Sequence, residues 1–140
     1  MASQQITVQT TINSPVERVW EAYATPADIT RWNFASDDWC CPGAEADLRV
    51  GGTYKARMEA KDGSLGFDFV AIYGELQPNR ALTLAMADGR KAWTTFALED
   101  GKTEVTTTFD AETQNPVEMQ RDGWQAILNN FKAYVEGESA

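Results

Sequence analysis

The chain has 140 residues, of which 43% are hydrophobic, and its formal net charge at pH 7 is −9. This length and composition predict a globular protein with one hydrophobic core, which we expect to form a single domain over residues 1–140. The acidic balance excludes the basic surface of a nucleic-acid-binding protein, and no run reaches the roughly 18 apolar residues of a membrane span.

The first third of the chain predicts one strand and two short helices. Residues 4–12 alternate between apolar and polar side chains, which is the period of a half-buried strand. Ser14 and Pro15 then predict a helix start, because both residue types favour the first turn. Pro26 ends that helix and can open a second short one that runs to about Trp32.

Residues 33–46 show no period, and we expect them to form a loop. A loop of this length is uncommon inside a compact domain and often has a function. Trp32, Phe34 and Trp39 lie in it or beside it. Two interpretations stay open: the aromatic side chains pin the loop to the core, or the loop covers the mouth of a pocket.

The two cysteines, Cys40 and Cys41, are neighbours in the sequence. Adjacent Cα atoms lie about 3.8 Å apart, which is too close for an ordinary disulfide. The N-terminal segment also lacks the basic region and apolar core of a signal peptide. We therefore expect a reduced, cytoplasmic protein. Two adjacent cysteines do not have the spacing of a zinc site, so no metal is expected.

The middle of the chain predicts an antiparallel meander, because alternating segments are separated by short turn signals. Gly51 and Gly52 indicate a bulge or a sharp bend before the first of these strands. The inward face of the second strand is left open, since both of its faces carry apolar residues. The predicted strands are residues 53–59, 67–76, 81–86, 91–98 and 102–110.

The C-terminal segment, from about residue 116 to 136, predicts one long amphipathic helix. Trp124, Ile127, Leu128, Phe131 and Val135 recur at helical spacing. An antiparallel sheet needs one face covered, and this helix is the only predicted element long enough to cover it. The predicted fold class is α+β: a curved antiparallel sheet that grips a long C-terminal helix, with two short helices after the first strand.

Three segments resemble the SRPBCC superfamily, whose fold is the START-like or helix-grip fold. They are residues 6–20, residues 47–54, and the ending that carries Gly123, Trp124 and Leu128. Within the superfamily the chain is similar to the family named for the activator of the heat-shock-protein-90 ATPase. The resemblance implies a cavity between sheet and helix that holds apolar or aromatic small molecules. Some members are polyketide aromatase/cyclases and some are lipid carriers. The shared motifs are structural, so they imply no catalytic residue.

The favoured function is therefore the binding of a small hydrophobic or aromatic molecule, such as a lipid or a polyketide. Pockets of this kind are mostly apolar with a few orienting polar groups. No cofactor is expected. The candidate ligand-binding residues are Trp32, Trp39, Tyr54, Met58, Phe69, Phe96, Phe109, Met119, Gly123, Trp124 and Ile127.

Two alternatives stay open. The first is a cyclase-like or hydrolase-like enzyme acting on a polyketide-like substrate. The chain has no histidine, so acid–base chemistry would need other groups. The second alternative is a chaperone cofactor or another protein-interaction module that uses an exposed apolar patch. The candidate acid–base groups are Asp37, Asp38, Asp68, Tyr54, Tyr73, Arg49 and Arg57.

Overall fold

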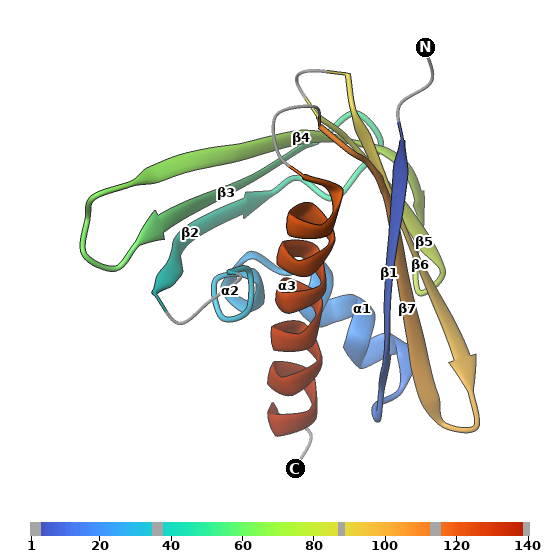
Figure 1. Cartoon of the computed structure of the whole chain (residues 1–140). Coiled ribbons are helices and arrows are strands. Elements are labelled where there is room, and N and C mark those ends of the chain that lie inside the picture. The colour runs from blue at the N-terminus through green and yellow to red at the C-terminus, as the bar shows by residue number, and fades with distance from the viewer. Residues whose placement is uncertain (1–3, 35–37, 87–88, 113–115, 139–140) are drawn as a thin grey trace.

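The computed structural model describes residues 4–34, 38–86, 89–112 and 116–138. It shows one curved sheet of seven antiparallel strands around a long C-terminal helix (Figure 1). The predicted fold class is confirmed. No helix within the described residues is long and apolar enough to cross a membrane. The elements are β1 (Gln5–Ile12), α1 (Val16–Ala24), α2 (Pro26–Ile29), β2 (Trp39–Ala46), β3 (Thr53–Ala60), β4 (Gly66–Gln77), β5 (Ala81–Met86), β6 (Lys91–Glu99), β7 (Lys102–Asp110) and α3 (Val117–Glu138).

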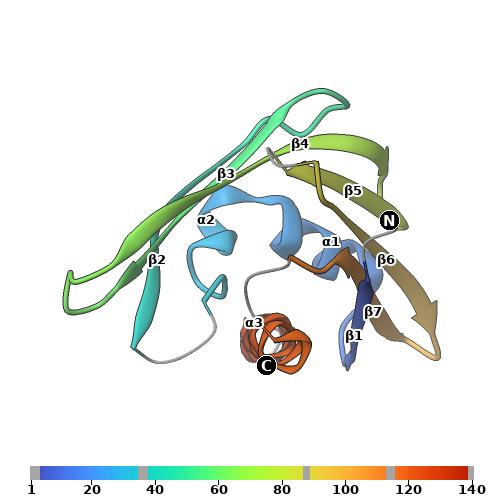
Figure 2. The ribbon, with the colours of Figure 1, turned by 45° about the horizontal axis from the view of Figure 1, so that its top comes forward.

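The strand order is β1-β7-β6-β5-β4-β3-β2, so the first two strands in the chain lie at opposite edges of the sheet. The chain between β1 and β2 contains α1 and α2, which lie on the concave side. Figure 2 shows α3 almost end-on, with the sheet curving around it and with α1 and α2 beside it. The other strands follow one another as a meander with short turns, as their alternating patterns predict.

The core lies between the concave face of the sheet and the helices. On β1 and β7 the inward positions alternate, and Ile6, Ile12, Val105 and Phe109 are buried. The C-terminal half of α3 closes the core with Leu128, Phe131 and Val135. Full burial of each such side chain contributes about 1.5–3 kcal/mol as an upper estimate. The N-terminal half of α3 has no fully buried side chain, and this leaves space above the core.

The prediction of a loop over residues 33–46 is wrong for its second part, because residues 39–46 form the edge strand β2. The pairing of β2 with β3 shifts register between Cys40 and Gly43. Such a bulge breaks the alternation by which a strand is recognised in a sequence. Pro42 lies within the bulge, at the edge of the sheet, where a missing N–H is tolerated.

The structure settles the inward face of β4. Ala71 and Tyr73 are buried, while Val70 and Ile72 are 38% and 41% exposed on the outer face. Before β3 the predicted bend is present, and Gly51 has a φ of +85°. A Cβ on the next residue, Gly52, would lie 2.0 Å from the carbonyl oxygen of Asp47. The bend therefore requires glycine at position 52.

Candidate functional site

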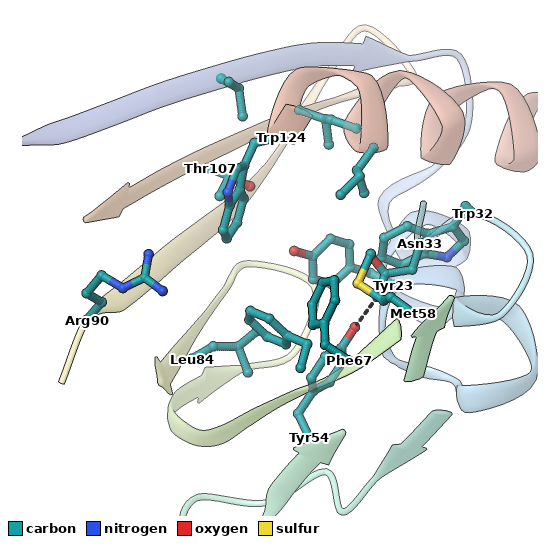
Figure 3. Close-up of a pocket in the computed structure, with 14 residues that line it drawn as sticks. Tyr23, Trp32, Asn33, Tyr54, Met58, Phe67, Leu84, Arg90, Thr107 and Trp124 are labelled. Carbon is teal, nitrogen blue, oxygen red and sulfur yellow. Dashed lines mark hydrogen bonds between the residues drawn. The ribbon is translucent and has the colours of Figure 1, made fainter. Parts of the chain in front are cut away.

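A cavity of about 270 Å³ lies between the sheet and the N-terminal half of α3. Its wall combines side chains from α1, the segment after α2, five strands, the residue before β6 and α3, and Figure 3 shows them around one space. Most of the wall is apolar or aromatic. The lining residues are Val8, Tyr23, Trp32, Asn33, Tyr54, Met58, Phe67, Phe69, Leu84, Arg90, Thr107, Trp124, Ile127 and Leu128.

The helix side of the wall is the upper part of the apolar stripe of α3. Trp124, Ile127 and Leu128 share one face because they are three or four residues apart. The indole ring of Trp124 stacks on Phe109, with ring centroids 4.0 Å apart. Phe109 is fully buried behind it. The indole therefore separates Phe109 from the cavity.

The α1 side of the wall is an aromatic pair. The rings of Tyr23 and Trp32 are stacked with centroids 5.3 Å apart, and Phe131 meets both of them edge-on. The indole N–H of Trp32 donates to the carbonyl oxygen of Ala22 at 3.0 Å. Because that donor already has its acceptor, Trp32 offers the cavity only apolar surface.

The sheet side of the wall joins apolar side chains to one buried phenol. Tyr54 meets Phe69 edge to face at a centroid distance of 6.0 Å, and its hydroxyl oxygen accepts a hydrogen bond of 3.1 Å from Nδ2 of Asn33. Figure 3 marks this bond beside Met58. Burial raises the pKa of Tyr54 well above its ordinary value. The phenol therefore stays protonated at neutral pH and can act as a hydrogen-bond donor.

A group of three hydroxyls, those of Tyr23, Thr94 and Thr107, lies at another part of the wall. Thr94 Oγ1 lies 3.3 Å from the hydroxyl of Tyr23 and 3.0 Å from Oγ1 of Thr107. Burial raises the pKa of Tyr23, although the hydroxyls of Thr94 and Thr107 partly offset this shift. Tyr23 and Thr107 both reach the cavity. Because each hydroxyl can donate or accept, this group can adapt to a polar atom of a ligand.

Most of the acid–base candidates do not lie on the described wall. Arg90 is the one charged residue among the described wall residues, and none of them is a carboxylate. Asp38 is exposed, and Asp68 is paired with Arg57 at 3.5 Å. Arg49 is an exposed partner of Asp47.

Of the remaining acid–base candidates, Tyr54 lies on the wall and Tyr73 does not. Tyr73 is buried but is not part of the wall, and Asp37 lies outside the described residues. Cys41 is buried, and burial raises the pKa of its thiol. No group of three metal-ligating side chains is present among the residues that the structure describes.

Six of the eleven candidate ligand-binding residues lie on the cavity wall, namely Trp32, Tyr54, Met58, Phe69, Trp124 and Ile127. The other five lie off it. Phe96 packs against Trp20 and Tyr23 in the core, and Phe109 lies behind Trp124. Trp39 lies near Phe67, Met119 is 62% exposed, and Gly123 is a half-buried part of α3.

Eight wall residues were not among the candidates. Five of them are apolar or aromatic residues. The sequence could indicate only that such a residue faces inward, and a position in the core was then the simpler expectation. Asn33, Arg90 and Thr107 are polar or charged, so the hydrophobic pattern of the sequence does not mark them. Only the folded structure shows that they lie at the cavity. The eight residues are Val8, Tyr23, Asn33, Phe67, Leu84, Arg90, Thr107 and Leu128.

Residues 13–136 match the family model described as "Activator of Hsp90 ATPase homolog 1-like protein". An AHSA1-like protein from Aeromonas hydrophila, solved by NMR, is 44% identical, with a TM-score of 0.91 over 97% of this chain and 94% of that one. A protein from Cytophaga hutchinsonii is 41% identical, with a TM-score of 0.82 over 96% and 94% of the two chains.

A third solved structure, of a protein from Chromobacterium violaceum, is 25% identical. Its TM-score is 0.86, and the match covers 95% of this chain and 98% of that one. Among curated proteins nothing matches significantly.

Proposed function

The chain belongs to the family of activator of Hsp90 ATPase homolog 1-like proteins, and we propose that it binds a small, mostly apolar molecule between the sheet and α3. The observation that carries this proposal is the cavity of about 270 Å³ with an aromatic wall and a few polar groups. Ligand sites in proteins have this composition, because apolar surface gives affinity while a few hydrogen-bonding groups fix orientation.

The cavity volume favours a compact ligand. The volume of about 270 Å³ lies just below the range of about 300–1,000 Å³ for ligand sites. A compound of one or two rings fits this space better than a sterol or a long acyl chain. The flat aromatic faces of Trp32 and Trp124 suit a planar ring.

The expected affinity is no tighter than micromolar. Burial of apolar ligand surface contributes about 0.8 kcal/mol per methylene group. A two-ring compound with ten carbon atoms therefore gains about 8 kcal/mol at most. A dissociation constant of 1 μM corresponds to a net binding free energy of about 8.2 kcal/mol, which is what remains after the cost of immobilising the ligand has been subtracted. Polar contacts with the wall would have to offset that cost.

The test is a titration with ring compounds, followed by amide chemical shifts and by thermal unfolding. In the variant Ile127→Trp the larger side chain enters the cavity, and we expect binding to be lost. Met119→Trp is the matched control on the same helix, because Met119 is exposed and is not a wall residue. Equal binding by both variants, or no binding of any ring compound by the wild-type chain, would refute the proposal.

A second candidate function is docking to a protein, and it is supported by apolar side chains on the convex face of the sheet. Val70 and Ile72 are partly exposed on β4, and Val50 is 68% exposed in the bend beside them. The bend adjoins β4 through a hydrogen bond from the Gly51 N–H to the Tyr73 carbonyl. The family description suggests a chaperone partner. An unchanged Hsp90 ATPase rate on addition of this chain would refute a role as an activator of that chaperone.

A further inference from the structure

We propose that the ligand is a neutral ring compound with a carbonyl oxygen, and that this oxygen accepts a hydrogen bond from the hydroxyl of Tyr54. The inference rests on the proposed function, because it names the chemical class of the molecule that the cavity takes. It follows from counting donors and acceptors on the wall.

The hydroxyl of Tyr54 has a proton without an acceptor. Its oxygen accepts from Nδ2 of Asn33 at 3.1 Å, and this is the one hydrogen bond that the hydroxyl makes with the described residues. Tyr54 is 5% exposed, and it lines the cavity. The hydroxyl therefore has to donate to something inside the cavity, which is water in the empty protein and an acceptor atom in the bound ligand.

The position of the hydroxyl is fixed because Tyr54 and Asn33 are both buried. The hydrogen bond between them has Asn33 as the donor and Tyr54 as the acceptor, so the proton of the phenol remains for the cavity. With the Asn33 amide reversed, Tyr54 would donate to Oδ1 of Asn33 and would have no proton left for a ligand, which the comparison of probes below would reveal.

The three hydroxyls of Tyr23, Thr94 and Thr107 provide a second polar contact. Their two hydrogen bonds, of 3.3 and 3.0 Å, can run in either direction along the three hydroxyls. Figure 3 shows Tyr23 and Tyr54 reaching the space from different sides. A ring compound can thus place its carbonyl oxygen at Tyr54 while a second polar atom, if it has one, meets Tyr23 or Thr107.

The charges favour a neutral ligand over an ionic one. A cationic ligand would find no carboxylate on the described wall, and only the faces of the aromatic rings could attract it. An anionic ligand would have Arg90 available at the edge of the space in Figure 3, but Arg90 already interacts within the chain. The net charge of −9 also repels an anion.

The experiment compares three probes that share one two-ring skeleton: tetralin, 1-tetralone and 1,2,3,4-tetrahydro-1-naphthoate. Their dissociation constants are measured by amide chemical shifts with the wild-type chain and with Tyr54→Phe. A ligand that leaves a buried donor unpaired binds about five- to 150-fold more weakly than one that pairs it. We expect 1-tetralone to bind at least about fivefold more tightly than tetralin to the wild-type chain.

In Tyr54→Phe we expect this preference to disappear while tetralin binds as before. Tyr73→Phe is the matched control, because Tyr73 is a buried tyrosine on the neighbouring strand that does not line the cavity. It should keep the full preference for 1-tetralone. The wild-type comparison needs no variant, so the proposal stays testable even if Tyr54→Phe unfolds.

Each of the other outcomes overturns the inference in a different way. Equal binding of tetralin and 1-tetralone would refute the role of the donor but leave the proposed function standing. Tightest binding of the carboxylate would show that the site takes an anion. A preference that survives in Tyr54→Phe would assign the donor to another residue. If no probe binds, the proposed function fails, and this inference fails with it.

Discussion

The indole ring of Trp124 lies face to face on the ring of Phe109, with centroids 4.0 Å apart and an angle of 11° between the planes. Phe109 is fully buried in β7, whereas Trp124 is one of three residues of α3 that line the cavity. The rigid sheet thus fixes the position of one wall of the cavity. Substitutions at the two residues should therefore affect both stability and ligand binding.

Phe109→Ala should lower the free energy of unfolding by about 3–5 kcal/mol, because it removes a fully buried ring and the support of Trp124. Urea denaturation measures the change. Phe67→Ala is the control, since Phe67 is 48% exposed, and we expect it to cost less than about 1.5 kcal/mol. An equal loss in the two variants would contradict the packing of Phe109 behind Trp124.

Gly52→Ala should destabilise the chain by about 1–3 kcal/mol, because the new Cβ forces the backbone apart. That atom would lie 2.0 Å from the carbonyl oxygen of Asp47, in the bend that leads into β3 and Tyr54. Gly43→Ala is the matched control, since a Cβ there would meet no atom within 4 Å. Thermal unfolding measures the stability of the two variants. Equal melting temperatures would contradict the close approach of Gly52 to Asp47.

Three of the four tyrosines should resist ionisation at alkaline pH. Burial raises the pKa of Tyr23, Tyr54 and Tyr73 above the ordinary value of 10.0. The folded chain thus keeps these phenols neutral while the unfolded chain ionises them. Stability should be unaffected by them below about pH 10 and should fall as the pH rises further.

A spectrophotometric titration of phenolate absorbance checks this expectation. Tyr23, Tyr54 and Tyr73 should ionise only above the ordinary range or together with unfolding. If all the tyrosines titrate near the ordinary value in the folded protein, the two phenols on the cavity wall are not buried as described.

Glu136 should stabilise the chain in a pH-dependent way. Its carboxylate accepts from the Asn13 N–H at 2.9 Å and from Lys132 at 2.6 Å, and these bonds lower its pKa. A lowered pKa means that the stabilisation is present above the unfolded value of about 4.5 and is lost as the pH falls through the folded value. Glu136→Gln should therefore be less stable than wild type near neutral pH, and the difference should shrink as the pH falls below about 4.5.

The periodic spacing of apolar and polar residues was enough to predict most of the fold. Residues such as Ile6, Val105 and Leu128 lie on the faces that their periods predict. The strand β2 could not be predicted, because its bulge between Cys40 and Gly43 removes the period. The inward face of β4 was ambiguous, because Val70 and Ile72 on the outer face are as apolar as the residues on the inner one.

The candidate site was harder to predict, because an inward direction does not tell which inward residues reach the cavity. Phe96 and Phe109 point inward, but Trp20 and Trp124 cover them. Met119 lies five residues before Trp124, which places it about 140° away around the helix. Thr107 faces inward in β7, but its hydroxyl acquires a role only through contact with Thr94 from β6.

The most direct test of the cavity is a set of intermolecular nuclear Overhauser effects between the wild-type chain and bound 1-tetralone. We predict contacts from the ring protons of the probe to the Met58 methyl group, the Trp124 indole and the Ile127 methyl groups, which all lie on the wall. Contacts confined to exposed side chains such as Met119 or Leu98 would contradict a binding site between the sheet and α3.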